Sequence, residues 1–179
     1  MDKSNTIACI CEGGAENAIM DILLENNALI FEKRDLLDDK IIKARSAKEF
    51  EQVYLRKSFS SKIIIYRILD SKRENFKLGK LFKDKCEVIN IITAPEIEML
   101  LIHSEDKYED YKKSGKKPSD YCKEDLKYKD VKSYNFVKSY FKDINKLICA
   151  IKIYKKKSKI KKSENCLFDL LNDNAVKKY

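Results

Sequence analysis

Carboxylates and glycines follow the first apolar run of the chain, where the sequence reads Glu12-Gly13-Gly14-Ala15-Glu16. An acid that directly follows a buried strand and precedes two glycines lies in a tight, exposed turn, and glycine allows a backbone or a phosphate to approach closely. Glu12 is therefore a candidate ligand for a divalent metal or a candidate general base. Glu16 falls in the first turn of the next helix, so it is either a further ligand or only a favourable charge at the helix N-terminus.

Further acidic positions follow two later apolar runs. Asp70 ends the run from Lys62 to Leu69, a place where α/β enzymes hold metal ligands; alternatively, it caps a following helix. Glu96 falls in the first turn of a helix after the run from Cys86 to Ile92. Glu98 lies two residues further on and points about 200° away around that helix. Glu96 is therefore expected near the same sheet edge as Asp70, and we do not expect the two glutamates to share one ligand sphere.

Positive charge suggests a polyanionic partner such as nucleic acid. The formal net charge is +9, although a lysine-rich composition also follows from an A/T-rich genome. The segment from Lys146 to Lys162 holds eight lysines and no acid. On a helix, three of them share a face opposite the apolar stripe, which is either a phosphate-binding face or an ordinary solvated one: Lys152, Lys156 and Lys159. Lys72 and Arg73, next to Asp70, are further candidates for contact with nucleic acid.

Apolar runs and helical periodicity alternate in the first half of the chain. Residues 1–93 read β-α-β-α-β-α-β, which predicts an α/β core with a doubly wound, mostly parallel four-stranded sheet flanked by helices. The predicted strands are Thr6–Cys11, Leu29–Phe31, Lys62–Leu69 and Cys86–Ile92. The helices between them are expected over Ala15–Asn26, over Phe76–Phe82 and from the capping box Ser46-Ala47-Lys48-Glu49, which opens a helix that packs Phe50, Val53 and Tyr54 inward. In such sheets the site lies at the C-terminal ends of the strands, where Glu12 and Asp70 fall.

The second half of the chain has a different character. Residues 94–179 carry only helical periodicity, which is strongest between Asp143 and Ser158. We expect this half to be a helical region that packs on the α/β core, so that the chain is one domain overall. His103, the only histidine, lies in the first of these helices, where a structural role is more common than a catalytic one.

Several classes of protein are disfavoured by composition. No apolar run approaches the ~20 residues that span a bilayer, and the first residues lack the apolar core of a signal peptide. We therefore expect a cytoplasmic protein with no membrane contact. The six cysteines include only one close pair, Cys9 and Cys11, whose spacing is that of strand alternation rather than of a zinc site. Reduced, mostly buried thiols are expected.

Three of these segments together resemble a known family. Glu12 to Glu16 looks like the Glu-Gly-x-x-Glu motif that opens TOPRIM domains, and the strand that ends at Asp70 corresponds to the one that ends in their Asp-x-Asp. The segment from Pro95 to His103 is similar to a Pro, Glu, Leu-Leu and His pattern of RloB-like TOPRIM proteins, small bacterial proteins of restriction and anti-phage loci. In that alignment Glu98 takes the place of the family glutamate. Residues 163–171 also look like that group's closing segment.

The resemblance implies a nuclease that depends on Mg²⁺ or Mn²⁺, that cleaves RNA, tRNA or DNA in bacterial anti-phage defence, and that works with an ATPase partner. It makes Glu12, Asp70 and Glu98 the catalytic candidates, with Glu12, Asp70, Glu16 and Glu96 as metal ligands. One departure is that Lys72 stands where the family has its second Asp. The enzyme then uses one metal, or Glu74 substitutes, or the site is degenerate and the chain is a nucleic-acid-binding or regulatory subunit. A phosphotransfer or nucleotide-binding enzyme is a weaker alternative, because no glycine-rich phosphate fingerprint is present.

Overall fold

The chain is described by a computed structural model that covers residues 6–44, 46–56, 59, 61–70, 76–93, 97–158, 160–161 and 163–178. Within these ranges no helix combines the length and the apolar character that crossing a membrane requires.

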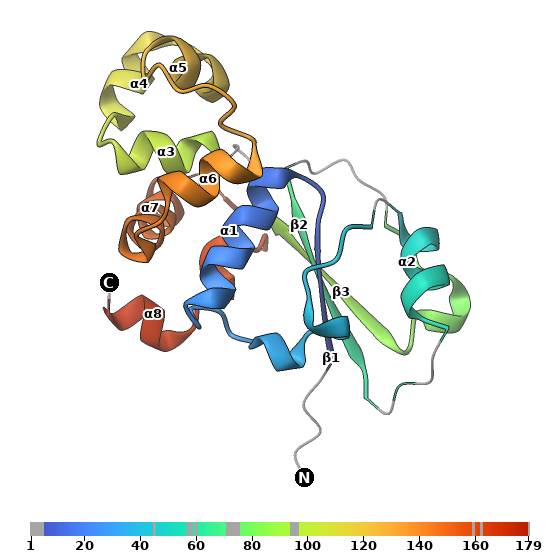
Figure 1. Cartoon of the computed structure of the whole chain (residues 1–179). Helices are drawn as coiled ribbons and strands as arrows, with labels where there is room; N and C mark the ends of the chain where they lie inside the picture. Colours follow the sequence, from blue (N-terminus) through green and yellow to red (C-terminus); the bar gives the residue numbers. More distant parts are fainter. Residues whose placement is uncertain are drawn as a thin grey trace.

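A parallel sheet of three strands forms the centre of the described structure (Figure 1). Its strands are β1 (Thr6–Cys11), β2 (Ile63–Leu69) and β3 (Cys86–Ile92), in the order β1-β2-β3. The register pairs Thr6 with Ile63, and Ile63 with Cys86. The most continuously apolar run of the sequence is thus the central strand, as expected for a strand with a neighbour on each side and a covered face above and below. An open, parallel α/β sheet is confirmed.

The expected strand over Leu29–Phe31 is not a strand of this sheet. Leu29 instead forms an isolated antiparallel bridge with Leu171, and Ile30 N–H donates to the carbonyl of Leu170. The outer edge of β1 is met by a different segment, in which Leu36 and Ile42 form isolated parallel bridges with β1. Two short 3-10 helices, η1 (Lys33–Asp35) and η2 (Leu37–Asp39), precede Ile42, and positive φ angles at Asp38 and Asp39 keep this segment from becoming a regular strand.

Helices cover both faces of the sheet (Figure 1). On one face α1 (Gly14–Glu25) buries Ile19, Ile22 and Leu23 in a cluster that includes Cys9 and Cys11 of β1. On the other face α2 (Ala47–Tyr54) buries Phe50 against the alternate β1 residues Ala8 and Ile10. As the capping box predicts, the Ser46 hydroxyl accepts a hydrogen bond from Glu49 N–H at 3.1 Å.

Two details of this second face differ from expectation. Val53, expected to pack inward from α2, is exposed. The expected helix over Phe76–Phe82 is reduced to the 3-10 helix η3 (Lys80–Phe82). Phe76 covers the Arg67 guanidinium at 4.4 Å from the ring centroid, and Gly79 N–H donates to the Glu51 carboxylate at 2.5 Å. These contacts beyond the segment itself hold Phe76 to Gly79 in a non-helical conformation.

The described part of the second half is helical, as predicted. Its elements are α3 (Glu98–Ser104), α4 (Tyr108–Ser114), α5 (Pro118–Glu124), α6 (Tyr134–Tyr140), α7 (Ile144–Lys157), the 3-10 helix η4 (Leu167–Leu170) and α8 (Asp173–Lys178). The side chains of Ser133 and Asp143 cap α6 and α7. Helix α7 packs against α3, and α6 packs against α1, so the helical half shares the core cluster on the α1 face of the sheet.

Candidate functional site

Glu12 and Asp70 follow the carboxyl ends of adjacent parallel strands. Cys11 pairs in register with Ile68, so Glu12 lies beside Leu69 and one residue short of Asp70. Both acids therefore belong to the edge of the sheet where open α/β folds place their sites, as the sequence predicted. Both residues are exposed to solvent, although the side chain of Glu12 is partly covered.

A buried arginine holds the Glu12 carboxylate. Arg67 Nη2 lies 2.6 Å from Glu12 Oε1, and the Arg67 side chain is 2% exposed against 27% for Glu12. The ring of Phe76 lies against the same guanidinium. A guanidinium this deep in the protein requires anionic partners, and Arg67 therefore positions the Glu12 carboxylate. This role was not predicted from the sequence, although a lone arginine inside an otherwise apolar strand was a visible signal.

The two glycines after Glu12 make room for parts of the chain itself. A Cβ on Gly13 would lie 2.0 Å from Oε2 of Glu16, so the Glu16 side chain folds back over the start of α1. A Cβ on Gly14 would lie 3.1 Å from the backbone nitrogen of Tyr134 and 3.3 Å from the carbonyl oxygen of Lys132. The close approach expected at this turn is thus made by a carboxylate and by the segment that leads into α6.

Glu16 is a buried acid in an electronegative neighbourhood. Burial raises the pKa of its carboxyl, a hydrogen bond from its own backbone N–H opposes that shift, and the negative charges of Asp70 and Glu98 raise the pKa further. Lys132 is the neighbouring cation, and it lowers the Glu16 pKa. Acids from β2, α1 and α3 therefore interact electrostatically at this edge of the sheet.

Glu98 is the first residue of α3, and its side chain is only 1% exposed. The ammonium of Lys132 lies 3.6 Å from Glu98 Oε1. The helix begins at Glu98 and turns its side chain toward the interior. Lys132 was not singled out from the sequence, because nothing local predicts that a loop 34 residues further on reaches this acid.

Other sequence candidates lie outside the described residues: Lys72, Arg73, Glu74, Glu96 and Lys159. Among the residues that are described, no group of three or more His, Cys, Asp or Glu side chains could hold a metal ion. Mg²⁺ commonly uses one or two carboxylates and keeps several water ligands. The oxygen donors of Glu12, Asp70, Glu16 and Glu98 fit that kind of binding in their chemistry, and they do not form an all-protein cage.

Lysines of α7 make contacts within the protein. Lys152 Nζ donates to the Val176 carbonyl at 3.0 Å, so one member of the expected phosphate-binding face is engaged by α8. Lys156 is exposed, and no described carboxylate lies within 4.0 Å of it. On the same helix, Lys155 pairs with Asp169 at 2.9 Å. The basic character of this segment therefore serves internal contacts as well as solvent.

His103 is buried near the end of α3. Its ring stacks on Tyr108 at 4.9 Å between centroids and lies 6.3 Å from the Tyr154 ring. Burial, and then the positive charge of Lys157, lower the pKa of His103 to about 4. An imidazole packed between tyrosines at the opposite end of α3 from Glu98 is a structural residue in this arrangement.

Comparison with protein-family models, with curated proteins and with solved structures finds no match to this chain.

Proposed function

We propose that the chain is a TOPRIM-like, metal-dependent nuclease whose site is the group of carboxylates at the carboxyl edge of the sheet. The observation that carries the proposal is that Glu12 and Asp70 end adjacent parallel strands, while the neighbouring Glu16 has a carboxyl pKa raised by burial and by two further acids. Clustered carboxylates repel one another, and a divalent cation relieves that repulsion. The net charge of +9 favours a polyanionic substrate, either RNA, tRNA or DNA.

Each described residue has a definable part in such a site. A bound Mg²⁺ or Mn²⁺ would supply stabilisation of the phosphate charge and a more acidic water. Glu12 and Asp70 are the residues that would hold it, and Arg67 keeps the Glu12 carboxylate in place. Glu16, whose carboxyl pKa is raised by burial, is the residue suited to hold and release a proton in such a site. Lys132 balances the charge of buried Glu98.

A second function, a non-catalytic nucleic-acid-binding or regulatory subunit, is favoured by a different observation. Arg67 already compensates Glu12, and Lys132 lies next to Glu98, so two of the four acids have a cation beside them. Lys72, where the resembling family has an aspartate, would add positive charge next to Asp70. The two functions differ in whether a divalent metal binds and whether phosphodiester bonds are broken.

Cleavage assays on labelled tRNA, single-stranded RNA and plasmid DNA separate the two functions. The protein is incubated with Mg²⁺, with Mn²⁺ or with EDTA, beside the variants Asp70→Asn and Glu12→Gln and the control Asp120→Asn on the exposed face of α5. We expect metal-dependent cleavage that both site variants lose and the control keeps. Binding of nucleic acid without cleavage would support the subunit instead.

Metal binding is measured independently of substrate. A cation that binds only the folded state raises the melting temperature, so Mn²⁺ is expected to stabilise the wild type and to stabilise Asp70→Asn less. No metal-dependent shift in the wild type, together with no cleavage, would exclude the nuclease.

We also propose the cellular compartment and the kind of partner protein for this activity. All six cysteines are free thiols and five are buried, which suits a reducing compartment such as the cytoplasm. We propose an anti-phage role with an ATPase partner, on the resemblance alone. The sequence contains no Walker A motif, so ATP hydrolysis would come from another chain. Co-purification from the native host tests for that partner.

A further inference from the structure

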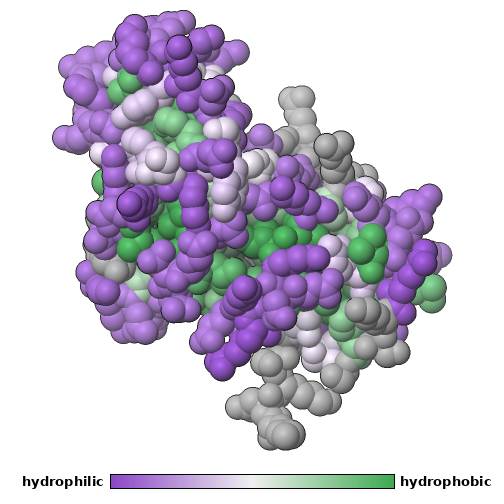
Figure 2. Space-filling model, in the orientation of Figure 1, coloured by the Kyte–Doolittle hydropathy of each residue, from purple (hydrophilic) through white to green (hydrophobic). Residues whose placement is uncertain are grey.

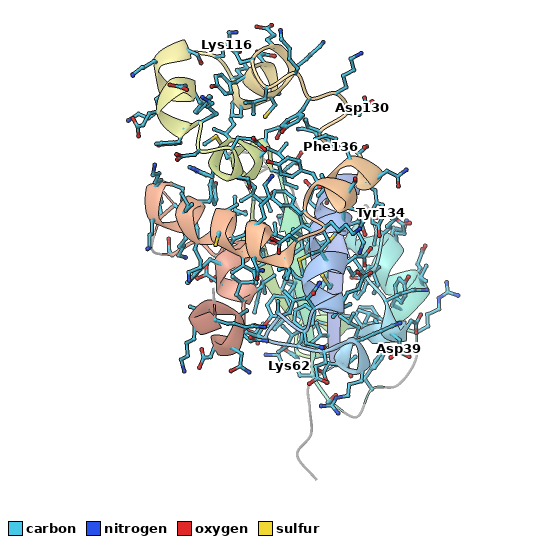
Figure 3. All side chains as sticks on the ribbon, turned by 60° about the vertical axis from the view of Figure 1, so that its left-hand side comes forward. Asp39, Lys62, Lys116, Asp130, Tyr134 and Phe136 are labelled. Carbon is cyan, nitrogen blue, oxygen red and sulfur yellow. The ribbon has the colours of Figure 1, made fainter. Side chains whose placement is uncertain are left out.

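A groove of about 410 Å³ lies along the outer side of α1, and the acids Glu12, Glu16, Asp70 and Glu98 do not line it. Helix α1 forms one wall and the segment from η1 to Lys43 the other, while Tyr134 from α6 closes one part (Figure 3). Figure 2 shows hydrophobic surface at the centre of this side of the molecule, between hydrophilic residues. The volume lies within the range of small-molecule sites, ~300–1,000 Å³.

The apolar part of the groove consists of Leu24, Ile41 and the ring of Tyr134. The Tyr134 hydroxyl donates to the Asp21 carboxylate at 2.8 Å, which fixes the orientation of the ring. The close backbone contact between Gly14 and Tyr134 holds the start of α6 against α1. A preoriented aromatic ring beside aliphatic side chains is a surface on which a flat heterocycle stacks.

Some of the charges in the groove are already compensated. Glu25 pairs with Lys138 at 2.6 Å, and Asp21 accepts the Tyr134 hydroxyl. Lys40, which also lines the groove, lies 4.0 Å from the Asp38 carboxylate. Three charged side chains of the lining remain, since the structure gives no hydrogen bond or ion pair to any of them within the described residues: Lys33, Lys43 and Asp39. A ligand that meets two ammonium groups and one carboxylate must offer both an anion and a hydrogen-bond donor.

We propose that this groove binds a nucleotide. The heterocyclic base stacks on Tyr134 above Leu24 and Ile41, the sugar hydroxyls donate to Asp39, and the phosphate accepts from Lys33 or Lys43. Carboxylates recognise ribose hydroxyls in this way in other nucleotide sites, and lysine ammonium groups recognise phosphate. No metal is required, so the proposal stands independently of the nuclease function.

The nucleotide has two possible sources, a free mononucleotide or the terminal residue of an oligonucleotide. Both present the same base, sugar and phosphate, so both fit the groove. Equilibrium titrations in EDTA with the four ribonucleoside monophosphates and with a short single-stranded RNA distinguish these sources. Adenosine, ribose 5-phosphate and inorganic phosphate show which parts of the nucleotide carry the affinity.

Variants assign the binding to the groove. Lys43→Ala and Asp39→Asn are each expected to weaken nucleotide binding by about fivefold to tenfold, the effect of losing one partly exposed charged contact. Tyr134→Leu is expected to weaken it similarly, whereas Tyr134→Phe keeps the ring and most of the affinity. Lys123→Ala, an exposed lysine of α5, is the matched control and should bind as the wild type does. All four positions are at the surface, and thermal melts verify folding.

The proposal is supported if a nucleotide from either source binds saturably and the groove variants weaken it while the control does not. It is overturned if no nucleotide binds, if inorganic phosphate binds as tightly as a nucleotide, or if the groove variants have no effect. Because EDTA is present throughout, these results do not depend on whether the carboxylates hold a metal. Metal-dependent stabilisation without nucleotide binding would overturn this inference and leave the nuclease proposal standing.

Discussion

Arg67 and Glu12 face each other from adjacent strands, with 2.6 Å between Nη2 and Oε1, and the arginine is the more deeply buried partner. The pair is therefore asymmetric in energy. Loss of the carboxylate removes an anionic partner from a cation in a low-dielectric interior, whereas loss of the arginine leaves a carboxylate that still reaches water.

This asymmetry predicts that Glu12→Ala destabilises the protein more than Arg67→Met does. We expect a loss of about 3 kcal/mol in the free energy of unfolding for Glu12→Ala, and about half of that for Arg67→Met, whose unbranched apolar side chain fills much of the same space. Urea denaturation measures both. The exposed Lys62–Glu87 pair on β2 and β3 is the control, and its removal should cost less than about 1 kcal/mol. Equal losses for the two site variants would contradict this account of the pair.

The close contact at Gly13 predicts an energetic coupling between positions 13 and 16. Its φ of −97° is open to alanine, so a substitution acts only through the contact of the new Cβ with the Glu16 carboxylate. We expect Gly13→Ala to cost about 1–2 kcal/mol, and the cost to fall by more than half when Glu16→Ala is the background. A double-mutant cycle in urea gives this coupling. Additive losses would mean that the contact is not the cause.

Glu16 itself is expected to be a destabilising residue. A folded-state pKa above the unfolded value means that the folded protein binds more protons, so stability rises as the pH falls through the folded pKa of Glu16. Glu16→Gln should therefore increase the free energy of unfolding at pH 7, by about 0.5–2 kcal/mol, and remove this component of the pH dependence. If Glu16 has the proposed part in proton transfer, the same variant loses cleavage. A less stable Gln variant would refute the electrostatic interpretation.

Local patterns were sufficient to predict much of the fold. The apolar run at β2 indicated a central parallel strand, and the capping box at Ser46 marked the start of α2. The strand expected at Leu29 was wrong because its hydrogen bonds go to residues 170–172, a partner that no local signal identifies.

The site was predicted less completely than the fold. The sequence placed Glu12 and Asp70 at one sheet edge, because strand ends can be located from local runs. Arg67, Lys132 and Tyr134 were not assigned to it, since each reaches its partner through tertiary packing rather than through spacing along the chain. For α7 the error is the opposite one, because the sequence suggested a phosphate-binding face where the protein makes internal contacts. Lys152 of that face donates to a backbone carbonyl, and the neighbouring Lys155 pairs with a carboxylate.

The lowered pKa of His103 predicts how the free energy of unfolding changes below pH 7. His103 is the only histidine of the sequence, and it packs against Tyr108 and Tyr154. Among the described residues, Lys157 is the charged group that affects its pKa. Its folded pKa of about 4 lies below the ordinary value of 6.5, so the folded state favours the neutral ring. Stability from this group is complete above pH 6.5 and is lost as the pH falls toward 4, by about 3 kcal/mol in total.

The profile of a variant isolates this contribution. His103→Gln cannot gain a proton in this range, so its free energy of unfolding should fall less between pH 7 and pH 4 than that of the wild type, even if the variant is less stable at pH 7. Urea denaturation at closely spaced pH values measures both profiles, and NMR titration of the single imidazole gives its pKa directly. An imidazole that titrates near 6.5 in the folded protein would show that His103 is not buried as described. The stability profiles of the wild type and the variant would then be parallel, and the loss of stability in acid would not come from His103.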